Sequence, residues 1–447
     1  MAARRVFPTA AKIASGTPAD RDRAIDVIRI VSLAGVVVGH TVMATSIITD
    51  GVFWWGNLLT TSVLFQSLTW IFQIMPLFFF AGVAASVSSY RAGGSWGGWL
   101  LKRCTRLYRP VFYYLAFWVL ALTVLRHVLP VHVYEPVAGI SIQLLWFLGA
   151  YVLVLAAVPL AAHLGTVPRF VAAVSAVYLT VALVDVVRVS GGPSALGYVN
   201  LVAWLIPGMF GAAYRRRLLT IRAALLLSAA TFAVNLALVW FGPYQPSLVG
   251  IEAPGLKNMT PPSLLLAGHA IMLCALAIAA APGIAGWARR PRIWRLVVIG
   301  TTGAMTLYLW HLPALLGVHL VFDYLGLARW PGQPHFFALG LAQLAVMAVL
   351  VSALFLVLRP LENRPLPLWD GGGVAKSGLR SAAVGGLLCT AGAATLASAG
   401  WGLKDQGIQC IVVMVLALIA ARGLAGADQR KLDALAPELS PTLRGTG

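Results

Sequence analysis

The stretch RDRAIDVIRIVSLAGVVVGHTVMA, residues 21–44, decides the fold of this chain. It is an apolar segment long enough to cross ~30 Å of hydrocarbon as a helix, because such a crossing needs about 20 residues. Two ionisable residues, Arg29 and His40, interrupt it with ten residues between them. Eleven helical steps of ~100° bring their side chains to within about 20° of the same face, roughly 16 Å apart. The stretch therefore predicts a membrane helix that carries an arginine and a histidine on one face.

The rest of the chain repeats this apolar pattern. The sequence has 447 residues, of which 60% are hydrophobic and only 11% are charged, whereas soluble proteins have about a quarter charged residues. Apolar runs of about 20 residues indicate helical spans rather than the alternating strands of a barrel. The predicted fold class is all-α, a polytopic membrane helix bundle. Twelve spans are expected, at 25–46, 69–89, 110–129, 139–161, 168–187, 196–214, 219–241, 262–284, 296–322, 335–358, 380–401 and 408–421.

The positive charge is explained by membrane topology rather than by nucleic-acid binding. The formal net charge is +19, but most Lys and Arg residues fall in short clusters on alternate loops, which is the positive-inside pattern. That asymmetry predicts that both termini lie in the cytoplasm. The first apolar run lacks a small-residue cleavage site and is interpreted as a retained span, not a signal peptide.

The spans and loops also predict a domain organisation. A Gly-rich stretch before the last two spans is typical of a linker, so these spans are interpreted as an appended hairpin. The predicted segments are a basic cytoplasmic leader at 1–24, a ten-helix membrane domain at 25–365, a linker at 366–379, two extra membrane helices at 380–421 and a cytoplasmic tail at 422–447.

Ionisable residues inside membrane spans are costly and suggest function by default. Arg29 lies about one turn inside its span, so the alternatives are an anchor that reaches the interface or a partner for Asp26, three residues earlier. His40 lies deeper and could instead be a neutral hydrogen-bond partner between helices. His311, in GAMTLYLWHLP at 303–313, lies about fifteen residues into a span of the same direction. The two histidines are therefore expected at similar depth, where one site could hold both.

A basic cluster precedes the third span. It contains Lys102, Arg103, Arg106 and Arg109, and three-residue spacing places the arginines on neighbouring helical positions. Arginine forks suit phosphates, although a positive-inside flank is the alternative. Four acidic residues, Asp50, Glu135, Glu252 and Asp323, are expected in external loops, as binders of a polar acceptor or as solvated loop acids. The four cysteines have no metal spacing, and no disulfide framework is predicted.

Five motifs in order resemble the acyltransferase-3 family of membrane O-acyltransferases. They are the Arg29 to His40 spacing, MPLFFFAGVAAS at 75–86, Arg103-Cys-Thr-Arg106-Leu-Tyr before Pro110, LLWFLGAY at 144–151 and MTLYLWHLP at 305–313. The resemblance covers roughly 21–365. It implies a ten-span core that moves an acyl group, expected to be acetyl, from cytoplasmic acyl-CoA to a carbohydrate or glycolipid hydroxyl, with acyl-CoA as co-substrate and no metal.

The same resemblance implies roles for individual residues. His40 would be the catalytic histidine with Arg29 as its motif partner, and Arg29, Arg103 and Arg106 would bind the donor. We also assign Trp146, Tyr308 and His311 to substrate binding. The alternatives are an aromatic residue of the membrane interface for Trp146 and a histidine of the bundle interior for His311. The expected partners are membrane lipids and a glycolipid or carbohydrate acceptor, without nucleic acid; the sequence leaves the oligomeric state open.

The alternative functions are a glycolipid or small-molecule transporter without chemistry and, more remotely, a scaffold subunit of an envelope-assembly complex. No broken spans recur in corresponding halves, which weighs against a transporter. The Ala, Val and Leu richness and the excess of Arg over Lys are typical of GC-rich bacteria. We therefore expect a bacterial cytoplasmic membrane. The family resemblance implies the acceptor, because family members in such bacteria acylate envelope glycolipids, including trehalose mycolates, and macrolide sugars, and we expect an envelope glycolipid.

Overall fold

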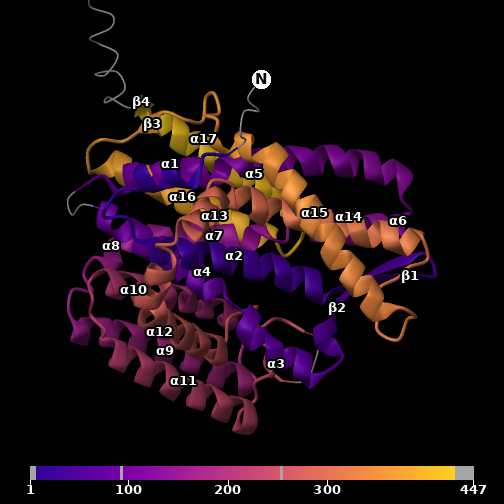
Figure 1. The fold of residues 1–447 in the computed structure, drawn as a ribbon, viewed down its shortest axis with the longest axis horizontal. Coiled ribbons are helices and arrows are strands. Elements are labelled where there is room, and N and C mark those ends of the chain that lie inside the picture. Colours follow the sequence, from indigo (N-terminus) through magenta and orange to yellow (C-terminus); the bar gives the residue numbers. More distant parts are fainter. Residues whose placement is uncertain (1–6, 91–93, 252–254, 428–447) are drawn as a thin grey trace, which may run out of the picture. The chain divides into compact units, whose positions relative to one another are not determined.

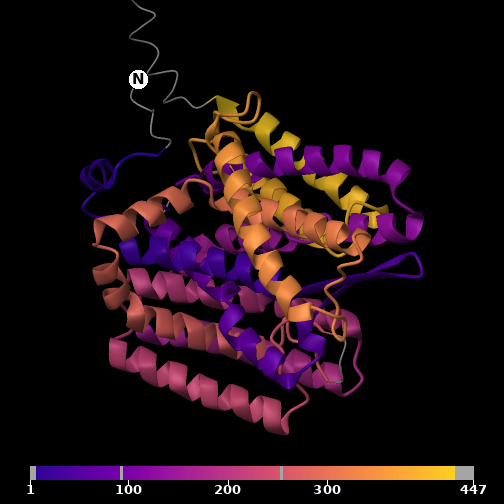
Figure 2. The same ribbon diagram turned by 45° about the vertical axis from the view of Figure 1, so that its right-hand side comes forward.

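The computed structural model describes residues 7–90, 94–251 and 255–427, and most of these residues are helical (Figures 1 and 2). Within them, twelve helical segments are long and apolar enough to cross a membrane. The all-α fold class and the predicted number of spans are thus confirmed. The twelve segments are Arg23–Met43, Val63–Ser89, Trp96–Val128, Val131–Ala156, Val167–Val189, Ser194–Arg215, Ile221–Phe241, Leu264–Trp287, Ala304–Tyr324, Phe336–Asn363, Leu379–Ser398 and Asp405–Leu424.

The chain forms two compact units, each built from segments that are distant in the sequence. The first comprises Met1–Ser88 and Leu160–Arg359, and the second comprises Ser89–Pro159 and Pro360–Gly447. The first unit contains α1 (Ala10–Ser15), α2 (Arg23–Met43), β1 (Ala44–Thr49), β2 (Val52–Asn57), η1 (Leu58–Thr60), α3 (Val63–Phe72), α4 (Met75–Ser86), α9 (Val167–Val189), η3 (Ser194–Trp204), α10 (Leu205–Arg215), α11 (Ile221–Phe241), α12 (Leu264–Trp287), α13 (Pro291–Thr301) and α14 (Ala304–Tyr324). The second contains α5 (Trp96–Val128), α6 (Val131–Ile140), α7 (Leu145–Ala156), β3 (Gly372–Gly373), α16 (Leu379–Ser398), α17 (Asp405–Leu424) and β4 (Gly426–Ala427). Three elements, η2 (Val87–Ser89), α8 (Val158–Ala161) and α15 (Phe336–Asn363), contain the points where the chain passes between units.

Close helix packing builds the core of the first unit. Helices α9 to α12 lie side by side (Figure 1), and apolar residues such as Phe80, Phe210 and Ile271 fill the interior. A Cβ atom on Gly211 of α10 would lie 2.4 Å from the carbonyl oxygen of Phe80 in α4. The close approach of these two helices therefore requires a glycine, in keeping with the small residues found at membrane helix interfaces.

Helices α13 and α14 replace the single span that the sequence predicted over 296–322. Helix α13 ends at Thr301 and α14 begins at Ala304. The hydroxyl groups of Thr301 and Thr302 donate to carbonyl oxygens of the last turn of α13, at 3.0 and 2.7 Å. These side-chain bonds to the backbone are added to the backbone bonds of the last turn, where the N–H of Thr302 donates to the carbonyl oxygens of Val298 and Ile299.

A β-hairpin follows α2, in the segment between the first two predicted spans, 25–46 and 69–89. Strands β1 and β2 are antiparallel, with Ala44 opposite Asn57 and Thr49 opposite Val52. The turn residues Asp50 and Gly51 both have positive φ, 53° and 75°. Asp-Gly between two segments with β-branched residues is a strong local hairpin signal. A hydropathy pattern does not detect that signal in so hydrophobic a region.

The last two spans pack within the second unit. Helix α16 contacts α5 and α7, and the Tyr108 hydroxyl on α5 lies 3.0 Å from the Thr395 hydroxyl on α16. A Cβ atom on Gly149 of α7 would lie 2.4 Å from the backbone nitrogen of Leu396 on α16. The backbones of α7 and α16 therefore pack closely at this glycine. The C-terminal helices therefore complete the core that α5 and α7 begin. The predicted domain boundaries themselves stay a prediction.

A buried carboxylate holds together the loops of the first unit. Asp185 on α9 is 1% exposed and accepts hydrogen bonds from Arg188 (3.0 Å), Asn200 (2.9 Å), Tyr244 (3.2 Å) and the backbone N–H of Leu264 (2.7 Å). Burial, followed by the neighbouring Asp185 carboxylate, raises the pKa of Tyr244. The phenol therefore stays protonated and remains a donor to Asp185.

Replacing Asp185 with alanine is expected to lower the free energy of unfolding by about 3–5 kcal/mol, because removal of one buried partner leaves the other charge unpaired. Thermal unfolding of the detergent-purified protein measures this loss. The matched control is Asp20→Ala, since Asp20 is exposed. Equal melting temperatures for the two variants would contradict a stabilising role for Asp185.

Candidate active site

Helix α2 carries both residues that the first motif singled out. The Asp22 side chain caps its first turn by accepting from the N–H of Ile25 at 3.2 Å, and the helix then runs unbroken through Arg29 and His40 to Met43. Asp26 pairs with Arg21 at 2.6 Å. The suggested pairing of Asp26 with Arg29 is therefore wrong, because the Asp26 carboxylate pairs instead with Arg21, which lies before the start of the helix.

The two predicted histidines meet in the first unit. His40 Nδ1 lies 2.9 Å from His311 Nε2, and the imidazole rings are nearly parallel, with centroids 5.2 Å apart. His311 is fully buried, whereas His40 is exposed. The structure thus brings α2 and α14 together at one pair of imidazoles, of which only His40 is open to a substrate.

Hydrogen-bond partners fix the tautomers of this pair when both rings are neutral. His311 Nδ1 lies 3.1 Å from the carbonyl oxygen of Leu307, and a carbonyl only accepts, so Nδ1 of His311 carries the proton. His311 Nε2 is then an acceptor, and His40 Nδ1 must donate to it. The lone pair of His40 consequently lies on Nε2. This arrangement presents a neutral base on the exposed ring.

Tyr308 lies beside the pair. Its ring centroid is 6.3 Å from that of His311, and the residue is 3% exposed. Because Tyr308 is three residues before His311 on α14, the two side chains share one side of the helix. Tyr308 therefore packs against the inner histidine, which is buried away from the exposed His40 ring.

Arg29 lies on the same face of α2 as His40, about three helical turns nearer the start of the helix. No described residue forms a hydrogen bond or an ion pair with the Arg29 guanidinium. The Arg29 side chain is half-buried. Ile30 packs against Gly300, close to the turn between α13 and α14. Arg359, which the sequence analysis did not single out, donates to the Thr302 hydroxyl in the same turn at 3.3 Å.

The other predicted donor-binding arginines belong to the second unit. Arg103 lies over the Trp99 ring, 3.8 Å from its centroid, and donates to the Ser89 hydroxyl. Arg106 is exposed. Arg109 is instead 8% exposed and pairs with Asp370. The basic cluster therefore divides into one structural arginine and two whose guanidinium groups lie nearer the surface of that unit.

Trp146, the remaining predicted substrate-binding residue, also belongs to the second unit. It lies in the first turn of α7, partly buried, with its ring centroid 6.0 Å from that of Phe147. The structure thus assigns the seven predicted site residues to two groups: Arg29, His40, Tyr308 and His311 in the first unit, and Arg103, Arg106 and Trp146 in the second.

The four acidic residues expected in external loops have different surroundings. Glu135 lies in α6 rather than in a loop and pairs with Lys404 at 3.2 Å, whereas Asp50 occupies the hairpin turn. Glu252 lies outside the described residues. Asp323 is in the last turn of α14 rather than in a loop. His319, which was not among the predicted site residues, lies on the same helix, and the available signal was a second ionisable residue inside a membrane span.

Comparison with known proteins agrees with the motifs. The family model described as an acyltransferase domain, that of the acyltransferase-3 family, matches residues 22–356. No curated protein matches the chain significantly, and neither does any solved structure. The match begins at the N-cap of α2 and includes both helices of the histidine pair. The chain therefore belongs to the acyltransferase-3 family and is a multi-pass membrane acyltransferase.

Proposed function

We propose that this enzyme transfers an acyl group, expected to be acetyl, from acyl-CoA to a hydroxyl group of a cell-envelope carbohydrate or glycolipid. The observation that carries the proposal is the 2.9 Å contact between His40 Nδ1 and His311 Nε2. It leaves His40 with an unprotonated Nε2 on an exposed ring. A neutral imidazole so oriented is suited to general-base catalysis on an alcohol.

The proposed reaction needs one base and no covalent acyl-enzyme. His40 Nε2 takes the proton of the acceptor hydroxyl as its oxygen attacks the thioester carbonyl, which gives a tetrahedral intermediate and an imidazolium. When the carbon–sulfur bond breaks, CoA leaves as a thiolate and receives that proton from His40. The products are the acylated acceptor and CoA thiol, and the histidine returns to its starting state. His311 positions His40 by accepting its Nδ1–H.

Arg29 is proposed to bind the phosphate-rich head of CoA. Helix geometry places it roughly 16 Å from His40 along α2, which suits a ligand whose charged head and reacting thioester are joined by a long arm. A guanidinium binds phosphate oxygens through paired hydrogen bonds. Arg103 and Arg106 of the second unit are proposed as further donor-binding residues, since the family motif includes them.

The Lys and Arg distribution supports a cytoplasmic position for both termini. The N-terminal half of α2, with Arg29, would then face the cytoplasm, where acyl-CoA is found. The His40 end would lie towards the opposite face of a bacterial cytoplasmic membrane, where envelope glycolipids such as trehalose mycolates are available as acceptors.

Substituting Arg29 with alanine is expected to weaken acetyl-CoA binding about 10- to 100-fold, because charge-assisted hydrogen bonds to phosphate are lost. Equilibrium binding to the detergent-purified protein measures the effect, with Arg29→Lys expected to retain part of the affinity through its charge. Arg169→Ala is the matched control, since Arg169 is an exposed arginine of the same unit. Wild-type affinity in Arg29→Ala would mean that Arg29 only anchors α2.

A further inference from the structure

A second polar cluster lies beyond the histidine pair in the first unit. The Ser46 hydroxyl of β1 is 2.7 Å from His319 Nδ1 and 2.6 Å from Asp323 Oδ2 on α14. Ser46 and His319 are both 0% exposed. Asp323 is partly buried, with its Oδ1 atom shielded, and burying polar groups together is costly unless their hydrogen bonds are satisfied.

Assigning the protons of this cluster leaves two of its acceptor atoms without a donor. Ser46 has a single hydroxyl proton, which it donates to the carboxylate of Asp323. Its oxygen therefore accepts from His319 Nδ1–H, and the lone pair of neutral His319 lies on Nε2. Within the described part of the chain, neither His319 Nε2 nor Asp323 Oδ1 has a hydrogen-bond partner. The cluster consequently presents two buried acceptors that call for O–H or N–H donors.

The connectivity rules out a nucleophilic triad. In such a triad the histidine lies between serine and carboxylate, so that it can take the serine proton. Here Ser46 lies between His319 and Asp323, and its proton points to the carboxylate. Ser46 is therefore a connector that orients the other two side chains.

The surrounding groups add a donor and an aromatic ring. The Trp55 ring of β2 lies edge-on to His319, with centroids 5.0 Å apart. Arg329 is 5% exposed and donates to the carbonyl oxygens of Val42 and Ala44, while its Nε has no partner among the described residues. Its own carbonyl accepts from the N–H of Ser46 at 3.1 Å. Acceptors, a donor and an indole together are the complement of a sugar, whose hydroxyls both donate and accept.

The cluster lies close to the proposed catalytic histidine. His319 follows His311 by eight residues on α14, which is a rise of ~12 Å with a turn of about 80° from the same face. Ser46 follows His40 by six residues, just after α2 ends. One acceptor molecule could therefore contact the cluster while another of its hydroxyls reaches His40.

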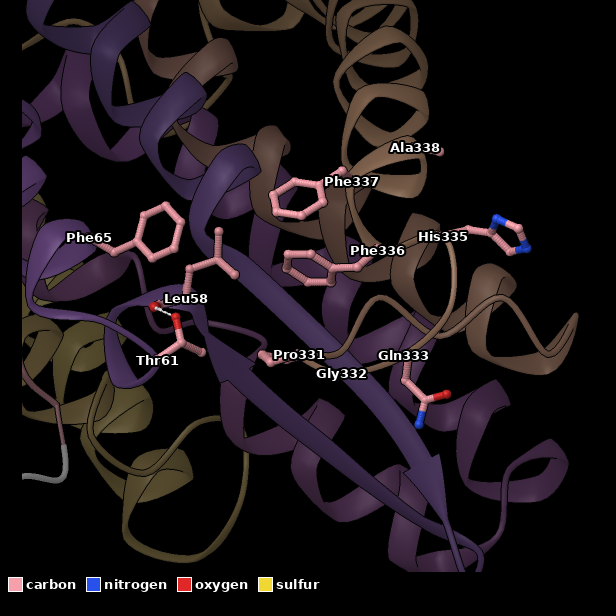
Figure 3. Close-up of a pocket in the computed structure, with 10 residues that line it drawn as sticks. All are labelled: Leu58, Thr61, Phe65, Pro331, Gly332, Gln333, His335, Phe336, Phe337 and Ala338. Carbon is pink, nitrogen blue, oxygen red and sulfur yellow. Dashed lines mark hydrogen bonds between the residues drawn. The ribbon is translucent and has the colours of Figure 1, made fainter.

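An apolar cavity of about 500 Å³, open to the surface, is lined in part by Phe336, a neighbour of Arg329. Figure 3 shows the rings of Phe65, Phe336 and Phe337 and the side chain of Leu58 on its walls, with the His335 imidazole pointing away. The Arg329 guanidinium lies over the Phe336 ring, 5.1 Å from its centroid. Arg329 thus joins the polar cluster to the cavity wall.

We propose that Ser46, His319 and Asp323 form the acceptor subsite, which binds the sugar head of a glycolipid while the cavity beside Phe336 takes its alkyl chain. The proposal rests on the proposed function and names its substrate as an amphiphile. Two sugar hydroxyls donate to His319 Nε2 and Asp323 Oδ1. A glycolipid is favoured over a free sugar because Arg329, whose carbonyl oxygen accepts from the N–H of Ser46, also lies over the ring of Phe336 on the cavity wall.

The test uses the full-length protein in lipid nanodiscs, acetyl-CoA as donor, and a trehalose monoester and free trehalose as acceptors. His319→Asn is the key variant, because its amide nitrogen can still donate to Ser46 whereas the Nε2 acceptor is lost. Asp323→Asn turns the open acceptor into a donor. Each is expected to raise the KM for the trehalose ester about tenfold, with unchanged KM for acetyl-CoA. His163→Asn, at an exposed histidine of the same unit, is the control.

The variant Phe336→Ala distinguishes the two possible acceptors, a glycolipid and a free sugar. It is expected to raise the KM for the trehalose ester but not for free trehalose. Equal use of both acceptors by the wild type and by Phe336→Ala would overturn the role of the cavity. Wild-type acceptor KM values in His319→Asn and Asp323→Asn would overturn the subsite.

Direct binding of the trehalose ester without acetyl-CoA distinguishes failure of the subsite from failure of the proposed function. If the wild type releases no CoA but binds the ester, and His319→Asn and Asp323→Asn weaken that binding, the subsite stands and the acyl-transfer proposal fails. Absence of ester binding to a wild type that does release CoA overturns the subsite alone.

Discussion

Replacing His40 with alanine is expected to lower the rate of acyl transfer by about 10²- to 10⁴-fold, the usual contribution of a general base. The imidazole lies on the exposed side of the pair, with its Nε2 lone pair open. Acetyl-CoA binding should remain, because Arg29 is about three helical turns away. Thiol release from acetyl-CoA in the presence of a trehalose monoester measures turnover, and equilibrium binding of acetyl-CoA measures the donor site.

His163→Ala is the control, since it removes an exposed histidine from the same unit. Turnover of His40→Ala at the wild-type rate would contradict a catalytic role. A wild type that binds the glycolipid, releases no thiol and moves the lipid across a vesicle membrane would instead favour the transporter alternative.

Replacing His311 with alanine is expected to lower kcat about 10- to 100-fold, because His40 Nδ1–H loses its acceptor and the ring loses its orientation. His311 lies 2.9 Å from His40 and is fully buried, so it acts through His40 rather than on the substrate. The KM for acetyl-CoA should be unchanged. His311→Gln should restore much of the rate, because its amide oxygen can occupy the position of Nε2 and accept from His40.

The matched variant is His311→Asn, whose shorter side chain mimics Nδ1 and cannot reach His40. If His311 only fills space, glutamine has no advantage over asparagine, and any difference in rate between the two variants should follow their melting temperatures. Rescue by glutamine alone supports the positioning role.

Hydrophobicity alone predicted the fold class and the number of spans, because the cost of placing polar backbone in hydrocarbon restricts such a chain to long helices. The same hydrophobicity hid local features. The Asp50-Gly51 hairpin follows α2, and the span predicted over 296–322 is two helices with a turn at Thr302. Both depend on hydrogen bonds of a few residues, which a hydropathy average does not resolve.

Part of the candidate site was also accessible from the sequence. Helical periodicity placed Arg29 and His40 on one helix, and span direction placed His40 and His311 at similar depth. The basic cluster shows the limit of such reasoning. Arg109 follows Arg103 and Arg106 with the same three-residue spacing, yet it alone is buried and pairs with Asp370, which is distant in the sequence.

The sequence by itself thus determined the all-helical membrane fold, the order of the spans and the family, because each depends on residue type and spacing along one segment. Only the tertiary structure decided which nitrogen of His40 carries the proton and that Ser46 joins His319 to Asp323. The physical reason is that a hydrogen bond between segments requires atoms to meet within about 3 Å, and that precision arises only when helices distant in the chain pack together.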